Sequence, residues 1–154
     1  MNVMDIIALM NANKEKNYAL CLCKGGFEGW LQVELWYYLN ILMGVSASRE
    51  VAYPIGGGYC DLVCDARGGY PAQWIEIKAF GAFRDGDERR VLESVGEDIV
   101  KIQRRPQGTA GAVYFLVPKA VAENVEAVIK EKQINYFQKK ETAHSTIFYV
   151  EVPA

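Results

Sequence analysis

Three ionisable side chains interrupt two apolar segments of this 154-residue chain. Asp61 lies in YCDLVCD, while Glu76 and Lys78 alternate with isoleucines in WIEIKAF. Two neighbouring carboxylates repel each other, and a divalent ion with oxygen ligands, Mg²⁺ or Mn²⁺, removes that repulsion. Such an ion lowers the pKa of a bound water, and a nearby lysine helps to position the water or offsets developing charge. The three residues therefore suit phosphodiester hydrolysis.

Two predicted strands, 59–65 and 73–80, position these side chains on either side of the turn-rich segment ARGGYPA. Successive side chains of a strand point to opposite faces, so Glu76 and Lys78 share one face and Asp61 lies on the face opposite to Cys60 and Leu62. If the strands pair antiparallel, Asp61, Glu76 and Lys78 converge. A cross-strand salt bridge on an exposed sheet face is the alternative, and it needs no metal.

The remaining elements follow from apolar periodicity and from glycine and proline signals. Helices are predicted over 3–12, 27–43, 87–105 and 119–132, and further strands over 48–53, 111–118 and 145–152. NANKEKN is expected to be a polar break, and YALCLC is too short to assign. The predicted class is α/β (α+β), a mixed β-sheet flanked by helices, in a single domain over 1–154.

Four segments in this order, GFEGWLQVELWYYLNILMG, SREVAYP, YCDLVCD and WIEIKAF, resemble the PD-(D/E)xK nuclease superfamily. The resemblance covers about residues 27–118 and implies the restriction-endonuclease-like fold, with the core order α-β-β-β-α-β and here an added C-terminal helix and strand. It implies that Asp61 and Glu76 bind the metal, with Ile77 as a further ligand, and that Lys78 is the catalytic lysine. Cys60 stands where the motif often has proline.

Many members of this superfamily add a glutamate from the first helix to the catalytic site. Glu28, in an ExxxQ arrangement with Gln32, matches one form of that motif, and Glu34, ten residues before Gly44, matches another. Six residues apart on a helix, the two side chains point about 240° apart, so at most one should reach the metal. Glu28 is the preferred candidate.

Contacts with nucleic acid have to come from local clusters, since the formal net charge is −2. Lys101, Arg104 and Arg105 have the spacing of one basic ridge near the end of the helix 87–105, although the helix dipole also favours cations there. DIVKI, 98–102, looks like a helix segment frequent in the superfamily, which favours Lys101. Further candidates for this role are Arg67, Arg84, Lys119, Trp30, Trp36 and Trp74.

Other kinds of site are disfavoured. Cys21, Cys23, Cys60 and Cys64 match neither a disulfide framework nor the usual zinc knuckles, so reduced thiols are predicted. The single His144 excludes a two-histidine metal site and is expected in a surface loop. No apolar stretch approaches the roughly 20 residues that span a bilayer, and no signal peptide is recognisable, so we expect a cytoplasmic protein without a membrane partner.

A metal-dependent nuclease is the leading hypothesis, with nucleic acid, DNA in preference to RNA, as the substrate. So small a chain lacks a separate recognition domain, which implies a homodimer, a partner protein or little specificity. A catalytically inactive interaction or immunity-type module with the same fold is the first alternative. An enzyme acting on a small phosphorylated or acidic substrate is the second.

Overall fold

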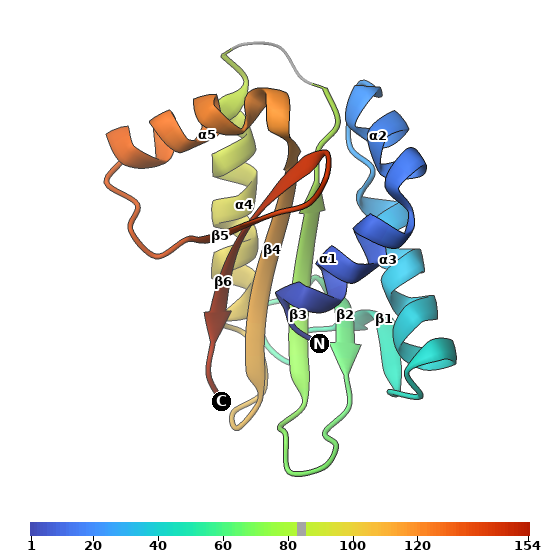
Figure 1. Ribbon diagram of the computed structural model, residues 1–154. Helices are drawn as coiled ribbons and strands as arrows, with labels where there is room; N and C mark the ends of the chain where they lie inside the picture. The colour runs from blue at the N-terminus through green and yellow to red at the C-terminus, as the bar shows by residue number, and fades with distance from the viewer. Residues whose placement is uncertain (83–85) are drawn as a thin grey trace.

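The computed structural model describes residues 1–82 and 86–154. It contains a six-stranded sheet in the order β1-β2-β3-β4-β6-β5, in which β3 and β4 run parallel and the other neighbours antiparallel (Figure 1). The strands are β1 Ala47–Ala52, β2 Tyr59–Cys64, β3 Gln73–Ala79, β4 Ala110–Pro118, β5 Gln138–Glu141 and β6 Ser145–Val152. The predicted mixed sheet is therefore confirmed.

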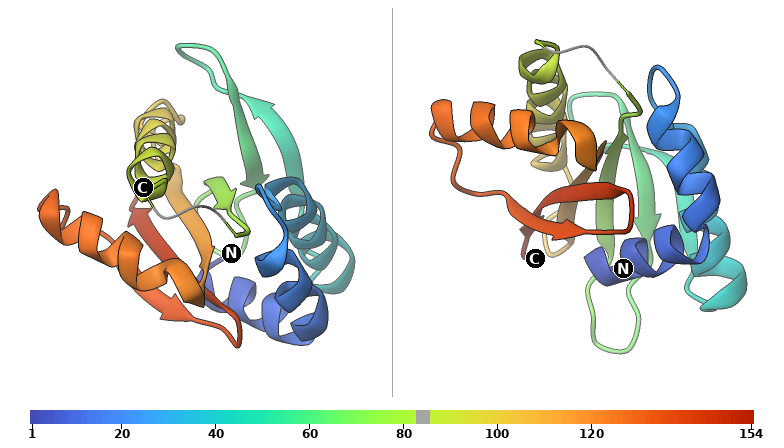
Figure 2. Two further views of the ribbon diagram at one scale, coloured as in Figure 1. Left: turned by 90° about the horizontal axis from the view of Figure 1, so that it is seen from above. Right: turned by 45° about the horizontal axis from the view of Figure 1, so that its top comes forward.

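Helices flank the sheet on both faces, as expected. They are α1 Val3–Ala12, α2 Lys14–Leu22, α3 Glu28–Tyr37, a π-helical turn η1 Tyr38–Leu42, α4 Glu88–Ile102 and α5 Lys119–Glu131. The view from above shows α4 and α5 on one side of the strands and α1 to α3 on the other (Figure 2). None of the described helices is long and apolar enough to cross a membrane.

An apolar layer fills the space on each side of the sheet. Leu31 and Leu35 of α3 belong to the layer that contains Ile77, while Val95 of α4 and Val125 of α5 belong to the opposite layer. β4 is buried along nearly its whole length, because both layers cover it. This double coverage explains the unbroken apolar run of that strand.

Two elements were not predicted. The last four residues of the expected polar break NANKEKN form the start of α2, where Asn17 is fully buried and its amide donates to Thr142 Oγ1 and Ser145 Oγ, at 3.3 and 3.4 Å. These partners are more than 120 residues away, so periodicity could not reveal them. β5 has the sequence QKKE and is fully exposed at the sheet edge, where lysines discourage further strand pairing.

β2 and β3 separate at Asp61. Their pairing runs from Cys64 opposite Gln73 to Leu62 opposite Ile75, and it stops there. Cys60 packs in the layer below α4 and α5, so the prediction that it shares a face with Leu62 is wrong. The cause lies in β1, where Glu50, opposite Asp61 in the register, has a left-handed φ of 53° that interrupts the regular alternation.

The segment before α3 takes the place beside the end of β3 that β2 leaves open. Gly26 forms a bridge with Phe80, and Lys24 forms one with Ala82. The approach is so close that a Cβ atom on Gly81 would lie 2.1 Å from the Cys23 carbonyl oxygen. The segment thereby places the first turn of α3 next to the C-terminal half of β3.

Candidate active site

Asp61 reaches its neighbours because β2 and β3 separate at this residue. Its Oδ2 accepts a hydrogen bond from the main-chain N–H of Ile77 at 2.7 Å. Burial raises the pKa of the Asp61 carboxyl; the Ile77 N–H and the Glu76 side chain offset part of that shift, and the charge of Asp98 adds to it. Asp61 and Glu76 are therefore close enough to influence each other's pKa.

Glu76 is fully buried, and both of its carboxylate oxygens have partners. Oε1 accepts from the Tyr53 hydroxyl at 2.6 Å, and Oε2 lies 3.0 Å from the Lys101 ammonium. Burial raises the pKa of Glu76 to about 8, and the charge of Asp61 contributes, although the Tyr53 hydrogen bond acts in the opposite direction. The charged form of Glu76 is thus disfavoured unless more positive charge is nearby.

Lys78 pairs with acids from two different helices. Its ammonium lies 3.4 Å from Glu28 Oε2 and 3.2 Å from Asp98 Oδ2. Burial lowers the pKa of Lys78, but the charges of Asp98 and Glu28 outweigh this effect and raise it. The expected alternative, a cross-strand salt bridge on an exposed face, is not what the described residues form, because Glu76 is buried and pairs with a lysine from α4.

Asp98 is one of the site residues that sequence reasoning missed, and Tyr53 is another. Asp98 is 2% exposed, and its Oδ1 lies 2.9 Å from Lys101 while its Oδ2 faces Lys78. Asp98 Oδ2 lies within ion-pair distance of the Lys78 ammonium, but the angles between them are outside the range of a hydrogen bond. The contact is therefore electrostatic. The DIVKI segment pointed to Lys101 alone, because an acid three residues before a lysine on a helix is an ordinary surface pattern.

Of the two alternative glutamates on α3, Glu28 is the one that contacts the site. Gln32 donates to Glu28 Oε1 at 3.4 Å and accepts from Arg49 at 2.9 Å, as the ExxxQ spacing allows. Burial raises the pKa of Glu28, and Lys78 opposes that shift. Within the described chain, Glu34 forms no hydrogen bond or ion pair with these residues.

The predicted basic ridge is divided among internal partners. Lys101 faces Glu76 and Asp98, whereas Arg104 donates to the Gly56 carbonyl at 3.1 Å. Arg105 donates to main-chain carbonyls, among them that of Thr109 at 2.8 Å. The assignment of the ridge to nucleic acid stays a prediction.

The other candidate contacts are scattered. Arg67 donates to the Gly44 carbonyl and Lys119 pairs with Glu141. Trp74 is buried, Trp30 packs against the core, and the indole N–H of Trp36 donates to the Ala47 carbonyl. Arg84 lies outside the described residues.

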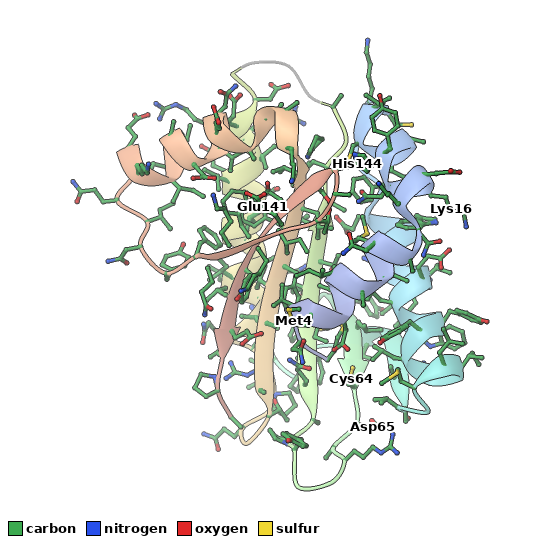
Figure 3. All side chains as sticks on the ribbon, in the orientation of Figure 1. Met4, Lys16, Cys64, Asp65, Glu141 and His144 are labelled. Atoms are coloured by element: carbon green, nitrogen blue, oxygen red, sulfur yellow. The ribbon has the colours of Figure 1, made fainter. Side chains whose placement is uncertain are left out.

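His144 lies at the turn between β5 and β6, where its ring contacts Tyr18 of α2 (Figure 3). It lies in a connecting loop, as expected, and its side chain is half-buried. All four cysteines are free thiols, and Cys23 is the exposed one. The predicted reduced state is therefore consistent with the structure.

The charges of the cluster do not balance. Four carboxylates, from Glu28, Asp61, Glu76 and Asp98, face two ammonium groups, from Lys78 and Lys101, which leaves two negative charges in excess when all six are ionised. This excess, together with burial, explains the raised pKa values of Glu28, Asp61 and Glu76.

The donor set suits a metal that keeps water ligands. Within the described residues, no three Asp, Glu, His or Cys side chains form a ready-made metal cage. Asp61 and Glu76, with the Ile77 carbonyl as the expected third ligand, would offer two carboxylates and one main-chain oxygen. Mg²⁺ is commonly held by one or two carboxylates with several waters, so these residues fit it.

A pocket of about 360 Å³ opens beside Glu28. Arg90 and Ser94 of α4 and the backbone of Gly25 and Gly26 contribute to its wall. A larger pocket of about 570 Å³ lies towards the β2–β3 turn, near Cys64 and Asp65 (Figure 3), but the acid and lysine cluster does not line it. Glu28 is the member of the cluster that lines the smaller pocket, so this pocket is the candidate approach to the site.

Comparison of the chain with protein-family models, curated proteins and solved structures finds no match. The function has to be inferred from the chemistry of this cluster.

Proposed function

We propose that the chain is a magnesium-dependent nuclease of the PD-(D/E)xK type, with a restriction-endonuclease-like fold, that hydrolyses phosphodiester bonds of nucleic acid. The observation that carries this proposal is the buried cluster in which Asp61 and Glu76 lie beside Lys101, and in which four carboxyl groups face only two ammonium groups. A divalent cation supplies the missing charge. Mn²⁺ is expected to substitute for Mg²⁺.

Asp61, Glu76 and the Ile77 carbonyl are the groups that would hold the ion. When bound, the ion supplies an acidified water and stabilises the charge that develops on the phosphate and leaving oxygens. The Tyr53 hydroxyl and the Ile77 N–H fix the orientation of the two carboxylates in advance. Such orientation reduces the reorganisation needed during the reaction.

Lys78 is the group proposed to position the attacking water and to offset negative charge. Glu28 and Asp98 hold its ammonium from two sides and keep it protonated, because together they raise its pKa. A protonated lysine donates hydrogen bonds and cannot act as a base. Its role is therefore electrostatic and orientational.

The substrate backbone is proposed to approach through the pocket beside Glu28. Arg90 is exposed, lines this pocket and forms no ion pair within the described residues, so it is free to contact a phosphate. DNA is the expected substrate, and the cluster itself does not distinguish DNA from RNA. A cytoplasmic location and a homodimer or partner protein remain part of this proposal.

Incubation with single- and double-stranded DNA and RNA, each with Mg²⁺, Mn²⁺ or a chelator, tests the activity. We expect cleavage of at least one nucleic acid with a divalent ion and none with the chelator. The double variant Asp61→Asn, Glu76→Gln, purified identically, is the control for contaminating nucleases. Cleavage that persists in this variant would refute the assignment.

An interaction module without catalysis is the second candidate. The observation that favours it is the pairing of Glu76 and Asp98 with Lys101, which already neutralises part of the cluster without metal. In that case wild-type protein should bind no divalent ion in calorimetry.

A further inference from the structure

We propose that Lys101 is a displaceable counter-ion: its ammonium pairs with the Glu76 carboxyl group in the metal-free protein and shifts to Asp98 alone when a divalent cation binds. This inference rests on the proposed metal site and assigns a positioning role to a residue predicted to contact nucleic acid.

The geometry gives Lys101 two acids at nearly equal distances. Its Nζ lies 3.0 Å from Glu76 Oε2 and 2.9 Å from Asp98 Oδ1. Asp98 is on the same helix, three residues before Lys101, so the lysine can keep this partner without any backbone movement. The contact with Glu76, across to β3, is the one that can be exchanged.

A divalent ion on Glu76 would compete directly with the ammonium. Metal–oxygen distances for Mg²⁺ are about 2.0–2.1 Å, so the ion and an ammonium on the same carboxylate would be only about 5 Å apart. The site is largely buried, and repulsion between cations is weakly screened there. The Tyr53 hydroxyl is neutral and occupies the other oxygen of Glu76, so it has no such reason to leave.

The exposure of the two partners shows which one moves. Glu76 is fixed in the sheet with no exposed side-chain surface, whereas 28% of the Lys101 side chain is exposed. Lys78 forms no ion pair with Glu76 or Asp61 in the described structure, so metal binding does not require it to move. Lys101 therefore sets the metal affinity of the site, and Lys78 remains in place for the reaction.

Titration calorimetry with Mn²⁺ alone tests this role in the full chain. Lys101→Met should bind Mn²⁺ about fivefold more tightly than wild type, the factor that corresponds to about 1 kcal/mol for an ion pair in which only the lysine is partly exposed. Without metal, the same variant should unfold at a lower temperature, because Glu76 loses a partner. Lys132→Met removes the same charge at a distant ion pair and should leave Mn²⁺ affinity within about twofold of wild type.

The outcomes separate this inference from the proposed function. Equal or weaker Mn²⁺ binding by folded Lys101→Met overturns the counter-ion role and leaves the metal site standing. Absence of Mn²⁺ binding in wild type and all variants overturns both. If Lys101→Met does not fold, Lys101→Gln replaces it, because the glutamine amide can still donate hydrogen bonds to these acids. Its Mn²⁺ affinity is then compared with that of wild type in the same way.

Discussion

Glu76 is a carboxyl group without exposed surface, surrounded by groups that act on its charge in opposite directions. Burial and Asp61 favour the neutral form, while Tyr53 and Lys101 favour the charged form. A side chain that costs stability when ionised is unusual in a sheet core unless it has a task. At the scale of single residues, this conflict is the clearest sign of function.

The stability of the metal-free protein should depend on the protonation of Glu76. Its pKa is about 8 in the folded state against 4.5 for the ordinary carboxyl, so the folded state retains a proton that the unfolded state releases. The free energy of unfolding should therefore fall as pH rises from about 4.5 to about 8, by at most about 1.4 kcal/mol per pH unit.

Chemical denaturation at several pH values in the presence of a chelator measures this slope. Glu76→Gln should flatten it, because the amide does not titrate. An identical slope in wild type and variant would show that Glu76 is not the group responsible.

Lys78→Met separates the reaction from metal binding. The change leaves Asp61 and Glu76 in place, so Mg²⁺ affinity should persist or rise, while cleavage should fall by about 10²–10⁴-fold. Calorimetry and a cleavage assay on the same preparation provide both values. Loss of metal affinity together with activity would show that Lys78 supports the structure rather than the reaction.

Most of this constellation could be predicted from the sequence. Asp61, Glu76 and Lys78 stand out because charge interrupts apolar strands, and Glu28 because of its spacing to Gln32. Asp98 could not be identified in this way, since an acid three residues before a lysine on a helix is an ordinary surface pattern. Its role depends on the packing of α4 against β3.

At the scale of elements, the site depends on two local departures from regular strands. Glu50 interrupts the alternation opposite Asp61, and the segment Cys23–Gly26 replaces β2 beside the end of β3. Neither leaves a periodic signal. The segment before α3 explains how Glu28 meets Lys78. Glu28 lies on α3, on one face of the sheet, whereas Lys78 faces α4 on the opposite face.

Gly81→Ala tests this arrangement. An added Cβ would approach the Cys23 carbonyl to 2.1 Å, so the segment must shift, and we expect a loss of about 1–3 kcal/mol of stability together with reduced activity. Gly96→Ala is the matched control: nothing lies within 4 Å of a Cβ there, and the helix interior should gain about 1 kcal/mol. Denaturant unfolding of both variants gives the values, and equal stability would contradict the close approach.

Arg90→Ala tests the proposed approach of the substrate along α4. Removal of one phosphate contact should weaken the binding of nucleic acid to catalytically inactive protein. The slope of log affinity against log salt concentration should become shallower by the equivalent of about one phosphate contact. Arg89→Ala is the neighbouring control, because Arg89 already pairs with Glu131 at 2.6 Å. Equal salt slopes for both variants would remove Arg90 from the interface.

At the scale of the whole molecule, the mixed sheet and its flanking helices follow from apolar periodicity. The predicted strand ends agree with the structure within one residue, since alternating and unbroken apolar runs report burial directly. Apolar periodicity did not predict α2 or β5. A buried polar network stabilises α2, and pairing at the edge of the sheet defines β5. The fold places the cluster where the pairing of β2 with β3 stops, and this is the location at which we propose a metal-dependent reaction.

Metal binding by wild-type protein and by Asp61→Asn, measured by titration calorimetry with Mg²⁺ and Mn²⁺, tests the central claim most directly. Wild type should bind a divalent ion, and Asp61→Asn should lose most of that affinity because a full negative charge facing the cation is gone. The metal-free variant should remain as stable as wild type or become slightly more stable, since the Ile77 N–H keeps an oxygen acceptor and carboxylate repulsion is relieved. Absence of binding by wild type, combined with destabilisation of Asp61→Asn, would contradict the account and make the cluster a structural one.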